Sequence, residues 1–432
     1  MKEIKESLRK LEPLIGKKAK GLWYLNLFSE DKTLLRLLLD KKAKNDFKDT
    51  IRLPPPIASK TKGEYHIGEI VYPEKIYSQF GLREDEFIKH ILITGMTGSG
   101  KTNLSFHILK ELTKKNKPFL VFDWKRNYKD LRQLPEFKDL TIIRLGSRTC
   151  DFRFNPLIPP KGVEPKHWMA MLIDIMKHAF FVGHGVEYFL RQGLDNLYKK
   201  YGIYEGGSNY PTLSELEKVL RKKYVKGREM LWMSSTKRVL SSLTFVGLLG
   251  DVLNSGKENY IDKLLNKKVI IEMDNLATIE KTFFVEALLL WIYEYRKLEN
   301  KRESFKHCIV IEEAHHIVSK KKERTAGEET VIETILRMIR EFGEGVIVID
   351  QEPQKVSDSI LANTNCKICF TLGNGTDIST IAKSMSLSLE QMGMIDKLKT
   401  GHAIVKNKRF DEPIHVKFPH IKIEKGKLVE NE

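Results

Sequence analysis

From residue 91 to residue 405, short apolar runs alternate with longer stretches in which apolar residues recur at helical spacing. The short runs lack a polar face, which is typical of strands buried on both sides of a parallel sheet with helices between them. The predicted strands are Ile91–Thr94, Phe119–Asp123, Thr141–Leu145, Val269–Met273, Cys308–Glu312, Gly345–Asp350, Cys366–Leu372 and Ala403–Val405. We therefore expect an α/β fold with a mainly parallel sheet.

The alternation stops between residues 161 and 265, where the pattern is helical throughout. In the segment PTLSELE, Thr212 can cap a helix and Glu215, three residues later, can bond back to it. The pattern predicts an all-helical insertion in the α/β core.

Residues 1–85 show a third pattern. Two amphipathic patches, Ile4–Leu11 and Thr33–Leu39, precede three consecutive prolines and the alternating run Tyr65–Val71, which is typical of an edge strand or hairpin. The predicted parts are a small helical and proline-broken N-terminal region (1–85), the first part of the core (86–160), the insertion (161–265), the second part of the core (266–420) and a tail (421–432).

The length of 432 residues and the hydrophobic content of 41% suffice for two or three folding units. No stretch reaches the ~18 consecutive apolar residues of a membrane-spanning helix, and the N-terminus has no apolar signal core. We expect a soluble, cytoplasmic protein without membrane insertion.

The formal net charge is +17, from 74 Lys and Arg against 57 Asp and Glu. This excess suits a polyanionic partner such as nucleic acid, although a lysine-rich thermophile surface would give the same balance. Cys366 and Cys369 form a CxxC pair in a strand-like run, for which a buried reduced pair is favoured over a zinc site.

The segment ITGMTGSGKTN fits the pattern G-x-x-x-x-G-K-[ST], with an apolar strand before it and a helical pattern after it. Glycines let successive backbone N–H groups face phosphate oxygens, a lysine adds a mobile charge, and a Thr hydroxyl can bind Mg²⁺. The sequence therefore predicts a site for ATP and Mg²⁺. Its residues are Gly95, Met96, Thr97, Gly98, Ser99, Gly100, Lys101, Thr102 and Asn103, with Thr102 at the metal.

Two glutamates follow the apolar run of HCIVIEEAHHIV, at the strand edge where open α/β sheets bind ligands. We expect Glu312 to hold Mg²⁺ through water and Glu313 to act as the base that activates a water molecule. Gln351, at the end of VIVIDQ, is a candidate sensor of the γ-phosphate; the alternative is a polar turn residue before Pro353.

Arg337 and Arg340 lie three residues apart, on one face of a predicted helix that ends at Gly343. The planar guanidinium suits a transition-state phosphate, which P-loop motors often contact from a neighbouring subunit. Plain complementarity to the helix dipole is the alternative.

These motifs, in this order, resemble the HerA and FtsK superfamily of DNA-pumping P-loop ATPases, and more distantly the conjugative coupling proteins. The matching segments are HILITGMTGSGKTN, VFDWKRNY, FRFNPL, VIIEMDNL, the carboxylate strand with EAHHIV, RMIREFGEG and DQEP, which span about residues 86–410. The chain departs from the family pattern at Glu312, where an Asp is usual, and in its N-terminal region, where HerA proteins have a β-barrel.

The resemblance implies a RecA-like core, a homohexameric ring around single- or double-stranded DNA, and a finger arginine at Arg340, with Arg337 second. It also allows a nuclease or other processing partner. Lys320, Lys321, Lys322 and Arg324, in the segment SKKKERTAGEE (319–329), are candidates for a pore loop that contacts DNA; a solvated loop is the alternative.

The leading hypothesis is an ATP-driven DNA translocase or helicase. A secretion or conjugation-type ATPase that moves protein or protein-bound DNA is one alternative, and an ATP-gated assembly switch is the other.

Overall fold

The computed structural model describes residues 53–424 except 73–74, 246–248, 257–258, 300–301, 303 and 328, together with residues 21, 24 and 51. The predicted amphipathic patches at 4–11 and 33–39 lie outside the described residues. The chain forms two compact units. The first contains the described residues up to Leu82, Gly95–Leu104 and Lys367–His420, and the second contains Arg83–Thr94, Ser105–Cys366 and the described residues from Ile421.

The second unit is built on a parallel sheet. Its strands are β3 (Ile91–Thr94), β4 (Phe119–Asp123), β5 (Thr141–Arg144), β6 (Lys268–Glu272), β7 (His307–Ile311) and β8 (Glu344–Asp350). Their order is β3-β8-β7-β4-β6-β5, and every neighbouring pair is parallel. The residues of β3, β4, β7 and β8 are all buried, as the apolar runs within them predict. The predicted α/β fold with a mainly parallel sheet is confirmed, and these strands begin and end within one residue of their predicted bounds.

The first unit carries antiparallel strands. They are β1 (Tyr65–Val71), β2 (Ile76–Leu82), β9 (Cys366–Cys369), β10 (His402–Lys406) and β11 (Ile414–Lys417), in the order β2-β1-β11-β10-β9. The predicted strand Tyr65–Val71 is confirmed and forms a hairpin with β2. The strand expected at Cys366–Leu372 ends three residues early, at Cys369, and both of its cysteines are buried and free.

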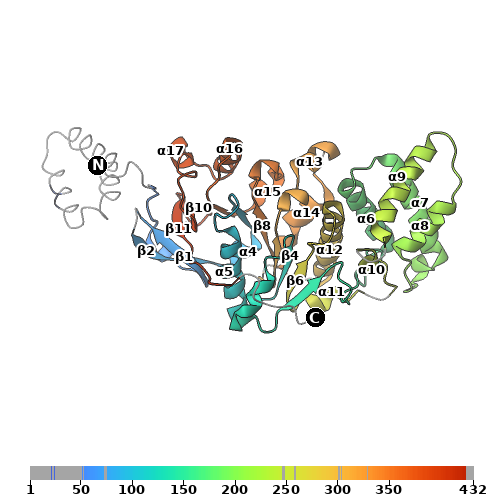
Figure 1. The fold of residues 1–432 in the computed structure, drawn as a ribbon, viewed down its shortest axis with the longest axis horizontal. Helices are drawn as coiled ribbons and strands as arrows, with labels where there is room; N and C mark the ends of the chain where they lie inside the picture. Colours follow the sequence, from blue (N-terminus) through green and yellow to red (C-terminus); the bar gives the residue numbers. More distant parts are fainter. Residues whose placement is uncertain are drawn as a thin grey trace. The chain divides into compact units, whose positions relative to one another are not determined.

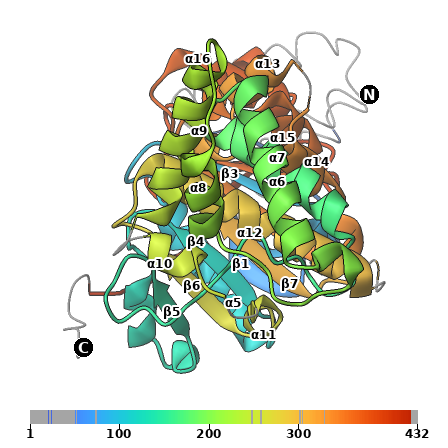
Figure 2. The same ribbon diagram turned by 90° about the vertical axis from the view of Figure 1, so that its right-hand side faces the viewer.

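Helices fill the segment between β5 and β6. They are α6 (Pro165–Ala179), α7 (His184–Lys200), α8 (Leu213–Lys222), α9 (Glu229–Thr244), α10 (Leu249–Leu253) and α11 (Ile261–Leu264). Figure 2 shows α6 to α9 side by side, and α6 packs on the long helix α12 (Thr278–Glu299). The predicted capping box starts α8, because the Thr212 hydroxyl accepts from Glu215 N and the Glu215 carboxylate accepts from Thr212 N.

Figure 1 shows the remaining helices of the second unit, among them α13 (Lys320–Ala326), α14 (Val331–Met338) and α15 (Asp358–Asn363). Among the described helices, none combines the length and apolar character that crossing a bilayer requires.

His90 fixes the end of α14 against the start of β3 in the second unit. Its Nδ1 accepts a hydrogen bond from Val346 N at 3.1 Å, so Nε2 carries the proton and donates to the Leu336 carbonyl at 2.6 Å. The ring is buried, and this burial lowers the pKa of His90 to about 4. The imidazole is therefore neutral in the folded protein near neutral pH.

This arrangement predicts a stability loss in mild acid. Between pH 6.5 and about 4 the unfolded chain protonates His90 but the folded chain does not, so unfolding is favoured as the pH falls. Replacing the imidazole in His90→Asn should shrink the difference in unfolding free energy between pH 7 and pH 5 by up to about 2 kcal/mol. Urea denaturation at the two pH values measures this difference.

The matched control is His184→Asn, since the His184 side chain is 90% exposed. That variant should keep the wild-type pH dependence. An unchanged pH dependence in His90→Asn would contradict the assignment of a buried neutral imidazole.

Candidate active site

The glycine-rich turn connects β3 to helix α5 (Lys101–Lys114). Gly95, Gly98 and Gly100 have φ angles of 155°, 78° and 121°, which residues with a side chain rarely adopt. A Cβ on Gly95 would also lie 2.6 Å from Phe370 Cβ. The turn is closed by a backbone hydrogen bond from Met96 N to the Thr371 carbonyl at 2.7 Å. Glycine is therefore required by backbone conformation and by close packing.

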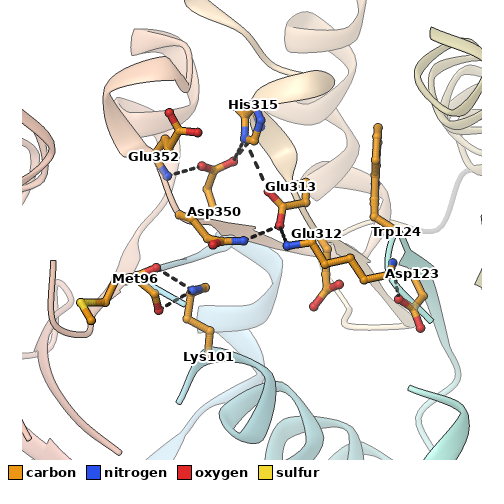
Figure 3. Close-up of polar contacts among 12 residues, drawn as sticks. Met96, Lys101, Asp123, Trp124, Glu312, Glu313, His315, Asp350 and Glu352 are labelled. Atoms are coloured by element: carbon orange, nitrogen blue, oxygen red, sulfur yellow. Dashed lines mark hydrogen bonds and ion pairs between the residues drawn. The ribbon is translucent and has the colours of Figure 1, made fainter. Parts of the chain in front are cut away.

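Lys101 curls back over this turn. Its Nζ donates to the carbonyls of Gly95 at 2.6 Å and Met96 at 2.9 Å, as Figure 3 shows. The Ser99 hydroxyl is buried and has no hydrogen-bond partner among the described residues. A lysine folded over a positive-φ turn with a buried hydroxyl fits a phosphate chain, which would bind the ammonium and the backbone N–H groups.

The other predicted residues of the turn differ in their exposure and contacts. Met96, Thr97 and Gly98 are exposed, while Thr102 is partly exposed in the first turn of α5. The Asn103 amide donates to the Pro419 carbonyl at 2.8 Å. The accessible Thr102 hydroxyl fits its predicted role as a ligand of a hydrated Mg²⁺.

Four buried carboxylates of the described residues mark the carboxyl edge of the parallel sheet in the second unit, and one of them, Glu272 at the end of β6, is 2% exposed and ion-paired with Arg126. Asp123 ends β4, Glu312 follows β7 and Asp350 ends β8, and their exposed fractions are 0%, 6% and 0%. Asp123 accepts hydrogen bonds from the backbone N–H groups of Lys125 at 3.0 Å and Tyr128 at 2.9 Å. The turn after β4 is thus folded around its own carboxylate.

The surroundings of Glu312 favour its protonated form. Burial, and next the charge of Asp123, raise the pKa of Glu312 to about 8. The Tyr128 hydroxyl donates to Glu312 Oε1 at 3.0 Å and lies 2.9 Å from the Ser105 hydroxyl. A divalent cation would replace the proton and offset the repulsion from Asp123, so Glu312 fits the predicted Mg²⁺ site.

Glu313 leaves the extended strand conformation, with a φ of 48°. Its Oε1 accepts hydrogen bonds from Lys125 Nζ and Gln351 Nε2, both at 2.5 Å. The structure thus brings together Glu313 and Gln351, which the sequence predicted as base and sensor, and Figure 3 shows the carboxylate beside Glu312.

Asp350 organises the turn after β7. Its Oδ2 accepts from the backbone N of His315 at 2.7 Å and from His315 Nδ1 at 2.9 Å, while Oδ1 accepts from Glu352 N at 2.7 Å. His315 Nδ1 also lies 3.9 Å from Glu313 Oε2. The two oxygens of Glu313 therefore have different surroundings.

The sequence predictions assigned no role to Lys125, Tyr128 or His315. The first two belong to the segment VFDWKRNY, which was recognised only as one of the segments that resemble the family. The available signal was Asp123 itself, because it ends an apolar strand in the same way as Asp350. Residues in the turns after such carboxylates are candidates to contact them.

The two predicted finger arginines differ in their contacts. Arg337, in α14, is held by Glu329 through Nε at 3.2 Å and a terminal nitrogen at 2.8 Å. Arg340 lies in the 3-10 turn Ile339–Phe342, is exposed, and forms no ion pair with a described residue. The α-helix ends earlier than predicted, at Met338, and Gly343, with a φ of 86°, ends the 3-10 turn that follows.

The prediction of a basic loop at 319–329 is wrong in part, because Lys320–Ala326 form helix α13. Ser319 caps this helix by accepting from Lys321 N at 3.2 Å. Lys322 is buried and ion-paired with the buried Glu286, so its ammonium is not available to DNA. Lys321 and Arg324 are exposed, while Lys320 is ion-paired with Asp358 at 2.8 Å.

Two solved structures share this fold. VirB4 of Thermoanaerobacter pseudethanolicus matches with a TM-score of 0.64 and 18% identity over 83% of this chain and 97% of that chain. The conjugative coupling protein TrwB in complex with ADP and Mg²⁺ matches with a TM-score of 0.60 and 12% identity over 86% and 93%. At these identities the likeness concerns the fold.

Curated relatives agree with the resemblance seen in the sequence. The DNA double-strand break repair helicase HerA of Sulfurisphaera tokodaii is 24% identical over 80% of this chain and 67% of the relative. The protein of the same name from Saccharolobus solfataricus is 25% identical over 87% and 75%. The family model for the central domain of helicase HerA matches residues 65–292, more than half of the chain. The chain therefore belongs to the HerA helicase family.

Proposed function

We propose that the chain is an ATP-hydrolysing motor that translocates along or unwinds DNA. The observation that carries the proposal is the placement of Glu313, whose carboxylate is held by Lys125 and Gln351 beside the buried Glu312. Membership of the HerA family and the net charge of +17 support DNA as the partner.

The glycine-rich turn follows directly in the sequence from a strand that ends at this edge of the sheet. Thr94, the last residue of β3, is paired in register with Asp350, the last residue of β8, and Gly95 follows Thr94 directly. In the proposed reaction Lys101 and the backbone of the turn hold the phosphates of ATP. Thr102 and Glu312 would hold Mg²⁺, which would neutralise charge on the phosphate oxygens.

Glu313 is the proposed general base. Both of its donors contact Oε1, so Oε2 is the oxygen we assign to accept a proton from the attacking water. Gln351 donates to the same carboxylate from the end of β8. We assign Gln351 the role of sensing whether the γ-phosphate is present.

We further propose a homohexameric ring in which Arg340 completes the ATP site of a neighbouring subunit. Arg340 is exposed and without an ion pair among the described residues, whereas Arg337 is occupied by Glu329. Such rings use heterologous interfaces, so each subunit can contribute one residue to the next. A nuclease or another processing partner is compatible with this arrangement.

The proposal predicts that DNA changes the ATPase rate. The rate should rise when single- or double-stranded DNA is added, and the DNA concentration needed should increase steeply with salt because phosphate contacts release counterions. Steady-state ATP hydrolysis across a salt series measures both effects. A rate indifferent to both kinds of DNA would instead favour the secretion-type or assembly-switch alternatives.

Glu313→Gln should abolish turnover but keep ATP binding. The amide can still accept hydrogen bonds from Lys125 and Gln351, but it cannot take a proton, so hydrolysis should fall by roughly 10²- to 10⁴-fold. Binding of a fluorescent ATP analogue and phosphate release provide the two readouts. The control is Glu229→Gln, at an exposed glutamate in the first turn of α9. DNA movement at the wild-type rate by Glu313→Gln would refute the motor.

The ring predicts complementation between inactive subunits. Arg340→Ala should lower the ATPase rate by on the order of 10³-fold if the guanidinium contacts the transferred phosphate. Mixing Arg340→Ala with Lys101→Ala subunits should restore part of the activity, since the second variant still supplies Arg340. Arg337→Ala is the matched control and should retain most activity. No recovery at any mixing ratio would rule out an arginine that acts in trans.

A further inference from the structure

A cavity of about 720 Å³ lies in the second unit beside His315 and His316. Its walls come from α13, from the first turn of α12, from the turn after α6 and from residues 354–355. This volume falls within the roughly 300–1,000 Å³ of typical ligand sites. Nothing in the proposed ATP reaction uses the cavity.

The lining of the cavity is basic. Lys320, Lys321, Arg324 and Lys355 contribute to it, and no described acidic residue does. Asp358 and Glu352 neutralise Lys320 and Lys355 from outside the lining. Lys321 and Arg324 are exposed and form no ion pair with a described residue, so they are the cations available to an anionic ligand.

Phe181 gives the cavity an aromatic surface. Its side chain is 48% exposed, although it follows a helix with a largely buried face, and its φ of 51° is rare for a bulky residue. Lys321 Nζ lies 4.9 Å from the centre of the ring. An exposed aromatic ring in an unfavourable backbone conformation, next to an available cation, is typical of a ligand-binding position.

The geometry points to a binding site for one nucleotide of a single DNA strand, with its base stacked on Phe181 and its phosphate contacted by Lys321 and Arg324. An unpaired base can leave its neighbours and stack on a protein ring, whereas both faces of a base in a duplex are covered. This inference rests on the proposed function, because it identifies the strand that the motor holds.

The test is binding of a fluorescein-labelled oligothymidylate, measured by anisotropy with the full-length protein. Phe181→Gly removes the ring and also suits the positive φ, so it should keep the fold, which thermal unfolding checks. The loss of one stacked base should weaken binding roughly 5- to 150-fold. Phe181→Tyr keeps the ring and should bind as the wild type does.

The charges are tested by the double variant Lys321→Ala with Arg324→Ala. It should weaken binding and lower the slope of log affinity against log salt by about 0.7, the value for one neutralised phosphate of a single strand. The matched control is Lys237→Ala with Arg238→Ala, which removes two charges that line a different cavity, on α9. This control should leave the slope unchanged.

The outcomes separate this inference from the proposed function. A wild-type protein that binds no DNA would refute the proposed function itself. If the wild type binds but Phe181→Gly loses less than fivefold, or the control pair reduces the slope as much as the cavity pair, the assigned cavity is wrong. Equal losses with a duplex would overturn the single-strand assignment. Competition by free thymidine monophosphate at the oligonucleotide's affinity would identify a mononucleotide site instead.

Discussion

The burial of carboxylates at one edge of a parallel sheet determines the turns around the candidate site. A buried carboxylate without hydrogen-bond donors is costly, so Asp123, Glu312 and Asp350 each require donors nearby. Asp123 obtains them from the backbone of its own turn, and Asp350 obtains them from His315 and Glu352. Hydrogen bonds to these carboxylates therefore set the conformation of the turns after β4, β7 and β8. These turns carry the residues proposed for catalysis.

Glu312 and Glu313 depend on this constraint in opposite ways. β7 ends at Ile311, the buried Glu312 follows it, and the positive φ of Glu313 then turns the chain away from the strand direction. Glu312 stays in the low-dielectric edge near Asp123, where its pKa is raised to about 8. Glu313 meets Lys125 and Gln351, from the turns after β4 and β8. Adjacent residues of the same type thus acquire different chemistry from their surroundings.

The strands and the glycine-rich turn could be predicted because the sequence patterns that indicate them lie within each segment. Fully apolar runs between helical patterns are typical of buried parallel strands. The spacing of glycines and lysine in the turn is set by the conformation of the turn's own backbone, so it can be recognised without knowledge of the tertiary fold. The roles of Lys125, Tyr128 and His315 could not be predicted in this way, since each depends on which strands become neighbours. Helix α13 was predicted as a loop for the same reason. Its Lys322 is buried against Glu286 of α12, and a lysine-rich run does not reveal such a partner.

The difference between Arg337 and Arg340 shows how tertiary contacts decide a role that spacing leaves open. Both residues follow the carboxylate strand three positions apart, but Glu329 binds the Nε edge of the Arg337 guanidinium through two hydrogen bonds. An ion pair that uses two of the guanidinium donors competes with contact to a neighbour's phosphate. The helix turns to 3-10 geometry at Ile339, and His90 binds the Leu336 carbonyl just before this point.

His90 precedes β3, the strand that leads directly into the glycine-rich turn. If the proposed ATP site is correct and Arg340 acts in trans, the same buried histidine connects the strand that carries one ATP site to the helix end that serves the next. A displacement of β3 on hydrolysis would then be passed through a short hydrogen bond of 2.6 Å to the neighbouring subunit's arginine contact.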